Sequence, residues 1–158
     1  MAGAGEGHTL AVNNIVASLT PQVRKQGCRA GASDLAVRTD EGRIRYPDAL
    51  VWCAPGSSDN REIAPILVVE VLSRSSAGID FVEKVAEYQA HATIRYILVV
   101  APGTVSVPFY ERSDQSDLWA HRKLTSLDDV ADLPPIEARL SLREIYEDLD
   151  PKPYLELV

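Results

Sequence analysis

The sequence has few of the residues that identify specialised classes of protein. Its 158 residues include only two cysteines, Cys28 and Cys53, and three histidines, His8, His91 and His121. Two cysteines without close spacing predict neither a disulfide framework nor a zinc site, so we expect two reduced, partly buried thiols. The histidines are too far apart in the chain for their spacing to indicate a metal site.

Long apolar runs are also missing. The longest, Ile66–Val69, resumes after Glu70 and ends at Leu72, far short of the roughly 20 residues that a membrane-spanning helix needs. The first residues, Met1–His8, lack the basic start and apolar stretch of a secretory signal. We therefore expect a cytoplasmic protein that does not contact a membrane.

The length and the charge bound the architecture and the partners. A chain of 158 residues predicts a single domain over residues 1–158. The net charge of −7 disfavours nucleic acid, but nine acidic and three basic residues lie from Leu127 onward, which leaves about −1 for residues 1–126. Six basic residues between Arg24 and Arg45 form either a local basic face or a solvated rim.

Hydrophobic periodicity predicts a mixed α/β sheet of about five strands with helices packed on it. The predicted helices are Thr9–Thr20, with a turn restarting at Pro21, Asp80–His91 and Leu142–Leu149, the last opened by a Ser141 capping box. The predicted strand segments are Arg29–Arg38, Ala49–Cys53, Ile66–Leu72, Tyr96–Val100, Val105–Tyr110 and Leu118–Leu124. The run Ile66–Leu72 is apolar at odd and even positions, which is typical of a central strand that is covered on both faces.

Glu70 is the anomaly in this central strand. An unpaired charged carboxylate there would cost several kcal/mol. A nearby cation must therefore compensate it, and two solutions remain open. Arg74 or Lys84 could form a structural ion pair with Glu70, or the carboxylate could bind a metal ion.

Asp48 is the second acid of interest. It opens the preceding strand, and if the two strands are neighbours, Asp48 and Glu70 can direct their oxygens into one space. Two carboxylates that close repel each other unless a proton or a metal lies between them. Oxygen ligands without His or Cys favour Mg²⁺ or Mn²⁺ over zinc. Taken alone, Asp48 would be interpreted as a turn cap.

Several segments together resemble one known family. They are Tyr46–Asp48, the run Ile66–Ser73, the helix positions Asp80, Lys84 and Tyr88, the strand entry Ile94–Tyr96, and the closing segment Leu140–Leu142 with Ile145–Tyr146. This combination is similar to the Uma-type restriction endonucleases within the PD-(D/E)xK nuclease superfamily. The resemblance covers nearly the whole chain and implies a restriction-endonuclease-like mixed β-sheet flanked by helices.

The resemblance also implies a site and an activity. Asp48 and Glu70 would bind Mg²⁺ or Mn²⁺, and a lysine would activate the water that hydrolyses a DNA phosphodiester bond. The superfamily's simplest pattern places this lysine two residues after the acid, where this chain has Leu72. Lys84 is then the candidate, supplied from the following helix. By analogy with the family, we also expect a homodimer.

Other features favour a different class of function. In the family, a hairpin with an acidic residue usually precedes the first helix, and the resemblance implies that this chain starts after it. Together with Leu72 and the acidic balance, this favours a catalytically inactive nuclease fold that binds nucleic acid or a protein partner; a structural scaffold is a third reading. Glu6 and His8 would fall near the site, but we expect them to cap the helix. Without the resemblance, the alternative for Lys84 is an exposed pair with Asp80.

Overall fold

The computed structural model describes residues 2–40, 42–54, 62–73 and 79–156, and for residues 2–4, 79 and 80 the backbone only. Arg74, one of the two cations expected to pair with Glu70, lies outside the described residues. Within the described part of the chain, no helix is long and apolar enough to span a membrane.

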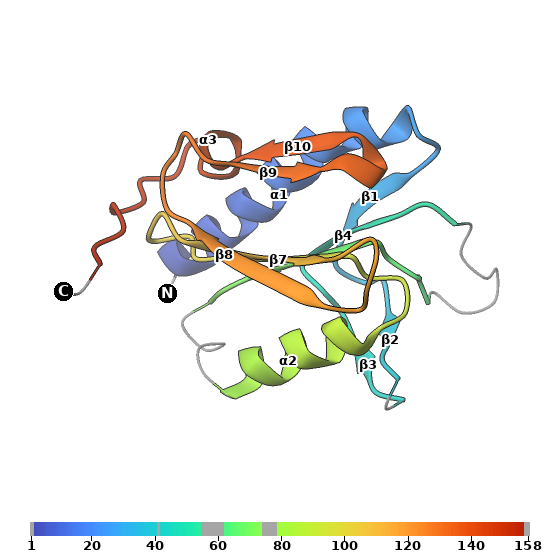
Figure 1. Cartoon of the computed structure of the whole chain (residues 1–158). Coiled ribbons are helices and arrows are strands. Elements are labelled where there is room, and N and C mark those ends of the chain that lie inside the picture. The colour runs from blue at the N-terminus through green and yellow to red at the C-terminus, as the bar shows by residue number, and fades with distance from the viewer. Residues whose placement is uncertain (1, 41, 55–61, 74–78, 157–158) are drawn as a thin grey trace.

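A six-stranded mixed sheet forms the centre of the molecule, in the order β1-β4-β5-β6-β7-β8 (Figure 1). Its strands are β1 (Arg29–Ala32), β4 (Ala49–Trp52), β5 (Leu67–Val71), β6 (Tyr96–Val100), β7 (Val107–Arg112) and β8 (Trp119–Leu124). The central pair β5 and β6 is parallel, and the other neighbouring pairs are antiparallel. The predicted α/β class with a buried central strand is therefore confirmed.

The two faces of this sheet are covered by different elements (Figure 1). One face carries α1 (Ala2–Arg24) with β9 (Val130–Leu133), η1 (Pro134–Ile136), β10 (Ala138–Ser141) and α3 (Leu142–Ile145). The other face carries α2 (Ile79–Ala90), beside the hairpin of β2 (Val37–Arg38) and β3 (Ile44–Arg45). The helix α2 forms the crossover that the parallel strands β5 and β6 require.

Alternation along β5 divides the core into two clusters. Leu67, Val69 and Val71 point into a large cluster on the α1 face. Val68 belongs to a smaller cluster on the α2 face, and Glu70 follows it on the same side because successive side chains of a strand point to opposite faces. All five residues of β5 are buried.

The helix α1 is longer than predicted. It runs from Ala2 to Arg24 and continues through Pro21, where we expected a restart. Proline removes one backbone hydrogen bond from a helix interior. The burial of Ile15 and Leu19 before it and of Val23 after it offsets this cost, because these side chains pack on the sheet.

Near the C-terminal end the prediction is partly correct. Ser141 caps α3 as expected, since its hydroxyl accepts a hydrogen bond of 3.1 Å from the backbone N–H of Glu144. The helix then ends at Ile145 instead of Leu149. The hairpin of β9 and β10 was not predicted, and it pairs Ala138 with Leu133.

The prediction of two reduced cysteines is wrong. Cys28 and Cys53 form a disulfide. The antiparallel pairing of β1 with β4 places Arg29 opposite Trp52, and the next pair outward is therefore Cys28 and Cys53, whose Cα atoms lie 4.0 Å apart. The spacing of the cysteines in the sequence gives no sign of this pairing, because it depends on the strand register.

Candidate active site

Of the two acids singled out in the sequence, Glu70 lies in β5 and Asp48 immediately precedes the neighbouring strand β4. The pairs Ala49–Val69 and Leu50–Val68 set the register of β4 against β5, and the next pair is therefore Asp48 and Glu70. Leu50 and Val68 belong to the α2-side cluster, so the alternation of both strands places the two acids on that face. The expectation that these strands are neighbours is confirmed.

Both carboxylate oxygens of Asp48 are held by the protein. The backbone N–H of Val71 donates a hydrogen bond of 2.7 Å to Oδ2. Nε2 of His8 lies 3.1 Å from Oδ1, and the two side chains remain 29% and 23% exposed. Strand β5 and helix α1 thus fix the orientation of an acid that immediately precedes β4.

The expected capping role of Glu6 and His8 is wrong. Both residues lie inside α1, which begins at Ala2, and a cap residue lies at the end of a helix. His8 turns instead toward the start of β4. The long helix makes this contact, because it carries its first turns beyond the region that the apolar spacing predicted.

Glu70 is buried, at 7% exposure, and it has two polar partners from α2. The hydroxyl of Tyr88 donates a hydrogen bond of 2.6 Å to Oε1, and Nζ of Lys84 lies 3.7 Å from Oε2. Tyr88 and Lys84 are one helical turn apart and therefore share a face of α2. Asp80 occupies the preceding turn of the same helix.

Burial and neighbouring charges compete over the ionisation of Glu70. Burial raises the pKa of its carboxyl group, the hydrogen bond from Tyr88 and the charge of Lys84 lower it, and the nearby Asp48 carboxylate raises it again. The balance is a pKa above the ordinary value. Burial, together with the adjacent Glu70 charge, also raises the pKa of Tyr88, so its phenol stays protonated and remains a donor. The pair of acids is therefore only partly compensated by the protein.

The donor atoms of this site suit a hard divalent cation. Asp48 and Glu70 offer oxygen ligands, which Mg²⁺ and Mn²⁺ prefer. Among the described residues, no group of three or more His, Cys, Asp or Glu side chains is placed to hold a metal ion. Mg²⁺ is usually bound through one or two carboxylates, with waters and substrate phosphates completing its shell.

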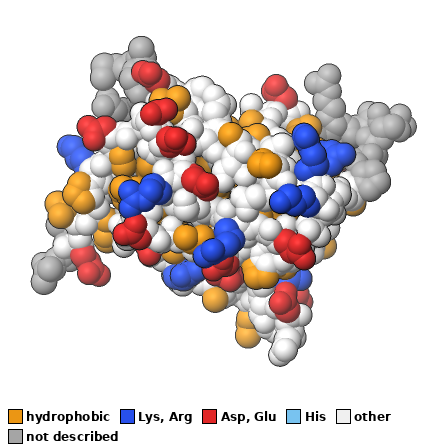
Figure 2. Space-filling view, turned by 90° about the horizontal axis from the view of Figure 1, so that it is seen from above, with side chains coloured by type: hydrophobic (Ala, Val, Ile, Leu, Met, Phe, Trp, Pro, Cys, Tyr) orange, Lys and Arg blue, Asp and Glu red, His pale blue; other side chains and the backbone are white. Residues whose placement is uncertain are grey.

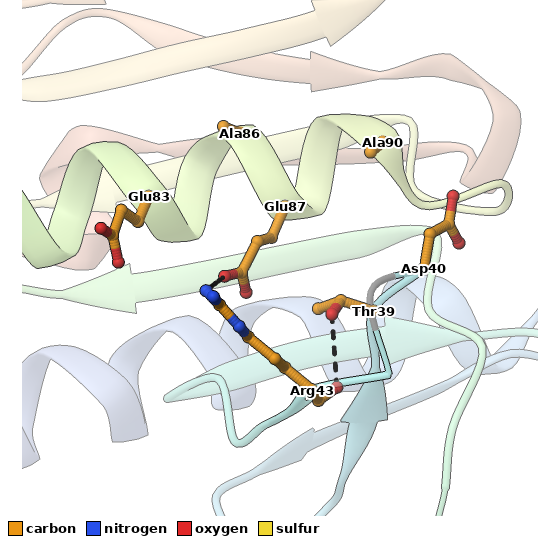
Figure 3. Close-up of a pocket in the computed structure, with 7 residues that line it drawn as sticks. All are labelled: Thr39, Asp40, Arg43, Glu83, Ala86, Glu87 and Ala90. Carbon is orange, nitrogen blue, oxygen red and sulfur yellow. Dashed lines mark hydrogen bonds and ion pairs between the residues drawn. The ribbon is translucent and has the colours of Figure 1, made fainter.

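A second polar cluster lies between α2 and the hairpin of β2 and β3 (Figure 3). Glu87 accepts hydrogen bonds of 2.7 Å from Arg43 and of 2.7 and 2.9 Å from Arg45. These contacts, with Arg45 contributing most, lower the pKa of Glu87. A cavity of about 320 Å³ adjoins the cluster and is lined by Thr39, Asp40, Arg43, Glu83, Ala86, Glu87 and Ala90.

This cluster explains part of the basic segment seen in the sequence. Arg43 and Arg45 join the hairpin of β2 and β3 to α2 through Glu87. Arg38 on the same hairpin pairs with Glu62. For these three arginines, the contacts indicate that they anchor the hairpin. Sequence reasoning missed the role of Glu87, because more than 40 residues separate it from Arg45 and no local pattern links them.

Comparison with known proteins identifies relatives of this chain. A family model described as Uma2, putative restriction endonuclease, matches residues 1–143. An uncharacterised protein of Synechocystis, slr1290, is 26% identical over 120 residues. That alignment covers 74% of this chain and 63% of the relative, so the chain spans less than two thirds of the length of that protein.

Proposed function

Because the chain belongs to the Uma2 family, whose model is described as a putative restriction endonuclease, we propose that it is a metal-dependent endonuclease that hydrolyses phosphodiester bonds in DNA. One observation carries the proposal: Asp48 and Glu70 meet across β4 and β5, and the Lys84 ammonium lies 3.7 Å from Glu70. The remaining parts of the proposal are Mg²⁺ or Mn²⁺ as the cation, the cytoplasm as the location and a homodimer that would place one site on each DNA strand.

In this proposal Asp48 and Glu70 hold the cation. A divalent cation there would lower the pKa of a bound water and polarise the scissile phosphate. Lys84 has its ammonium beside Glu70, where it can stabilise negative charge on the attacking water or on the phosphate oxygens. The helix α2 thus supplies the lysine that other PD-(D/E)xK nucleases take from the strand. This chain has Leu72 at that strand position.

Three groups around the acids act as positioning groups. Tyr88 fixes one oxygen of Glu70 by its hydrogen bond. The N–H of Val71 and the ring of His8 fix the two oxygens of Asp48. Partners of this kind orient metal-binding carboxylates, and their loss typically lowers metal affinity or activity 10- to 100-fold, an order-of-magnitude range.

Nicking of supercoiled plasmid tests the activity. We expect relaxation of the plasmid with Mg²⁺ or Mn²⁺ and none with EDTA. Asp48→Ala, Glu70→Gln and Lys84→Ala should each slow it by roughly 100-fold or more, whereas the matched α2 variant Glu83→Gln should cleave like the wild type. Metal-independent nicking, or equal nicking by Asp48→Ala, would show that the acid pair is not the catalytic centre.

A second candidate function is a nuclease fold that binds nucleic acid or a protein partner without cleaving. It is favoured by Leu72 in place of the strand lysine and by the existing compensation of Glu70 by Lys84. Calorimetric titration with Mn²⁺ separates the two candidates before any substrate is known. If the site is a nuclease site, the wild type should bind Mn²⁺ and the Asp48→Ala variant should not. A binding module whose Glu70 charge is already compensated by Lys84 should bind no Mn²⁺.

A further inference from the structure

On the side of the sheet that faces α2, the strands β7 and β8 form a strip of six residues beside the acid pair: Pro108, Tyr110, Arg112, Trp119, His121 and Lys123. We infer that this strip binds the phosphate backbone and exposed bases of the nucleic acid strand whose phosphate lies at Asp48 and Glu70. The inference rests on the proposed function, because it takes the acid pair as the point where the strand is cut. It adds a binding surface centred on Lys123.

The strand register places Lys123 in line with the two acids. Glu70 pairs with Val99 across β5 and β6, and Pro108 pairs with Lys123 across β7 and β8. Across β6 and β7, Leu98 pairs with Phe109. The next residues along these antiparallel strands, Val99 and Pro108, therefore lie opposite each other. Neighbouring strands lie about 4.8 Å apart, so the backbone of Lys123 is roughly 14 Å from that of Glu70. This equals about four nucleotides at 3.4 Å of helix axis each.

Packing shows which side chains share this side of the sheet. Tyr110 and Trp119 pack on the α2-side cluster, whereas Phe109 and Leu124 belong to the α1-side cluster. Alternation therefore gives the strip six residues from the two strands: Pro108, Tyr110, Arg112, Trp119, His121 and Lys123. None of the six carries a carboxylate. The acid of β7, Glu111, points to the other side, where it pairs with Arg122 at 3.8 Å.

The strip combines a cation with aromatic rings. Lys123 is exposed, its Nζ donates a hydrogen bond of 3.2 Å to the Tyr154 hydroxyl, and it lies 4.9 Å from the centre of that ring. The rings of Tyr110 and His121 stack with their centres 5.6 Å apart. A positive charge beside aromatic rings is the arrangement that binds a nucleic acid strand through phosphates and stacked bases.

The opposite side of the molecule does not offer this chemistry. Figure 2 views the molecule from the side of α1, β9 and β10, and acidic and basic side chains are mixed across it. Arg139 is held by Asp132 at 2.8 Å, and Arg143 by Asp128 at 2.5 Å. The strands β9 and β10 belong to the part of the chain from Leu127 onward, which carries nine acidic residues against three basic ones. A phosphate backbone is therefore disfavoured there and favoured at the strip.

Fluorescence anisotropy of a labelled DNA duplex and a labelled single strand, in EDTA and over a series of salt concentrations, tests the strip without cleavage. Lys123→Ala should weaken binding several-fold at low salt and reduce the slope of log affinity against log salt by about 0.9 on the duplex and 0.7 on the single strand. His121→Ala should weaken single-strand binding without changing the slope, because it removes a stacking surface. The matched control Arg139→Ala removes one positive charge from the opposite side and should bind like the wild type.

The outcomes separate this inference from the proposed function. Equal affinity and slope for Lys123→Ala and Arg139→Ala would overturn the strip, even if the wild type cleaves DNA through Asp48 and Glu70. A Lys123-dependent affinity in a protein that never cleaves would support the strip and refute the nuclease. Loss of self-association in Lys123→Ala, seen by size-exclusion chromatography with unchanged DNA affinity, would assign the strip to a protein contact and overturn the inference.

Discussion

The two faces of the central sheet differ in the polarity of the side chains that they bury. The α1 face is apolar throughout its buried cluster, which extends from Ala11 in α1 to Tyr146 after α3. The α2 face has a much smaller apolar cluster and contains both buried carboxylates of the described residues, Glu70 and Glu87. The same strands β4 and β5 contribute to both faces.

This contrast assigns stability to one face and chemistry to the other. A continuous apolar cluster contributes through burial, at about 25 cal/mol for each Å² removed from water. A buried carboxylate costs free energy unless its partners compensate it. Glu87 is fully partnered by Arg43 and Arg45, whereas Glu70 retains a raised pKa. Glu70, the buried carboxylate whose charge is not fully compensated by its partners, is thus the one that lies in the candidate site.

The largest loss of stability should come from the centre of the α1 face. Phe109 is completely buried and its ring lies 6.0 Å from that of Tyr96. Phe109→Ala should lower the free energy of unfolding by about 3–5 kcal/mol in denaturant titrations. Val82→Ala, at a position 66% exposed on α2, should change it by less than about 0.5 kcal/mol. Similar losses in both variants would show that the burial of Phe109 does not account for its contribution to stability.

Loss of the disulfide between Cys28 and Cys53 should cause the second largest decrease in the free energy of unfolding. The disulfide closes a segment with a sequence separation of 25, for which about 2–4 kcal/mol of stabilisation is typical. Reduction of the wild type, or the pair Cys28→Ser and Cys53→Ser, should therefore lower the free energy of unfolding by that amount. The double variant serves as the control, because a reductant should not affect it. Unchanged unfolding of the wild type in reductant would show that the bond contributes nothing.

Glu87→Gln should cost about 2 kcal/mol at neutral pH, because it removes charged hydrogen bonds to two arginines. The pKa of Glu87 is lowered from 4.5, so its contribution is present above that pH and is lost as the pH falls through the lowered pKa. The difference in stability between wild type and variant should therefore close in acid. A difference that is constant across this range would show that the charge of Glu87 is not responsible.

Glu70→Gln should change the free energy of unfolding least of the four variants, and it should raise this free energy instead of lowering it. The pKa of Glu70 is raised above 4.5, so its protonated form is stabilising and this contribution is lost as the pH rises through the raised pKa. In EDTA at neutral pH, the variant should be more stable than the wild type by on the order of 1 kcal/mol. The gain should vanish as the pH approaches 4.5, and thermal melts at several pH values measure it. A destabilised variant would mean that Lys84 and Tyr88 fully compensate the charge.

Local patterns predicted the elements that form the candidate site. The apolar run around Glu70 predicted a strand covered on both faces, and β5 is buried at every position. The amphipathic spacing around Lys84 predicted a helix that differs from α2 by one residue at each end. These predictions succeeded because hydrophobic periodicity reports which side of an element is buried. The meeting of Asp48 with Glu70 needed one further assumption, the pairing of β4 with β5.

The remaining features depend on contacts between distant segments. His8 reaches Asp48 only because α1 begins at Ala2 and packs across the sheet. Cys28 meets Cys53 through the register of β1 with β4, and Lys123 joins the row of Glu70 through three successive strand pairings. Local sequence patterns located β5 and α2, the elements of the candidate site, because the information that specifies them is local. Which side chains meet across them was specified by the packing of the whole sheet, since register and helix placement minimise the exposed apolar surface of the complete domain.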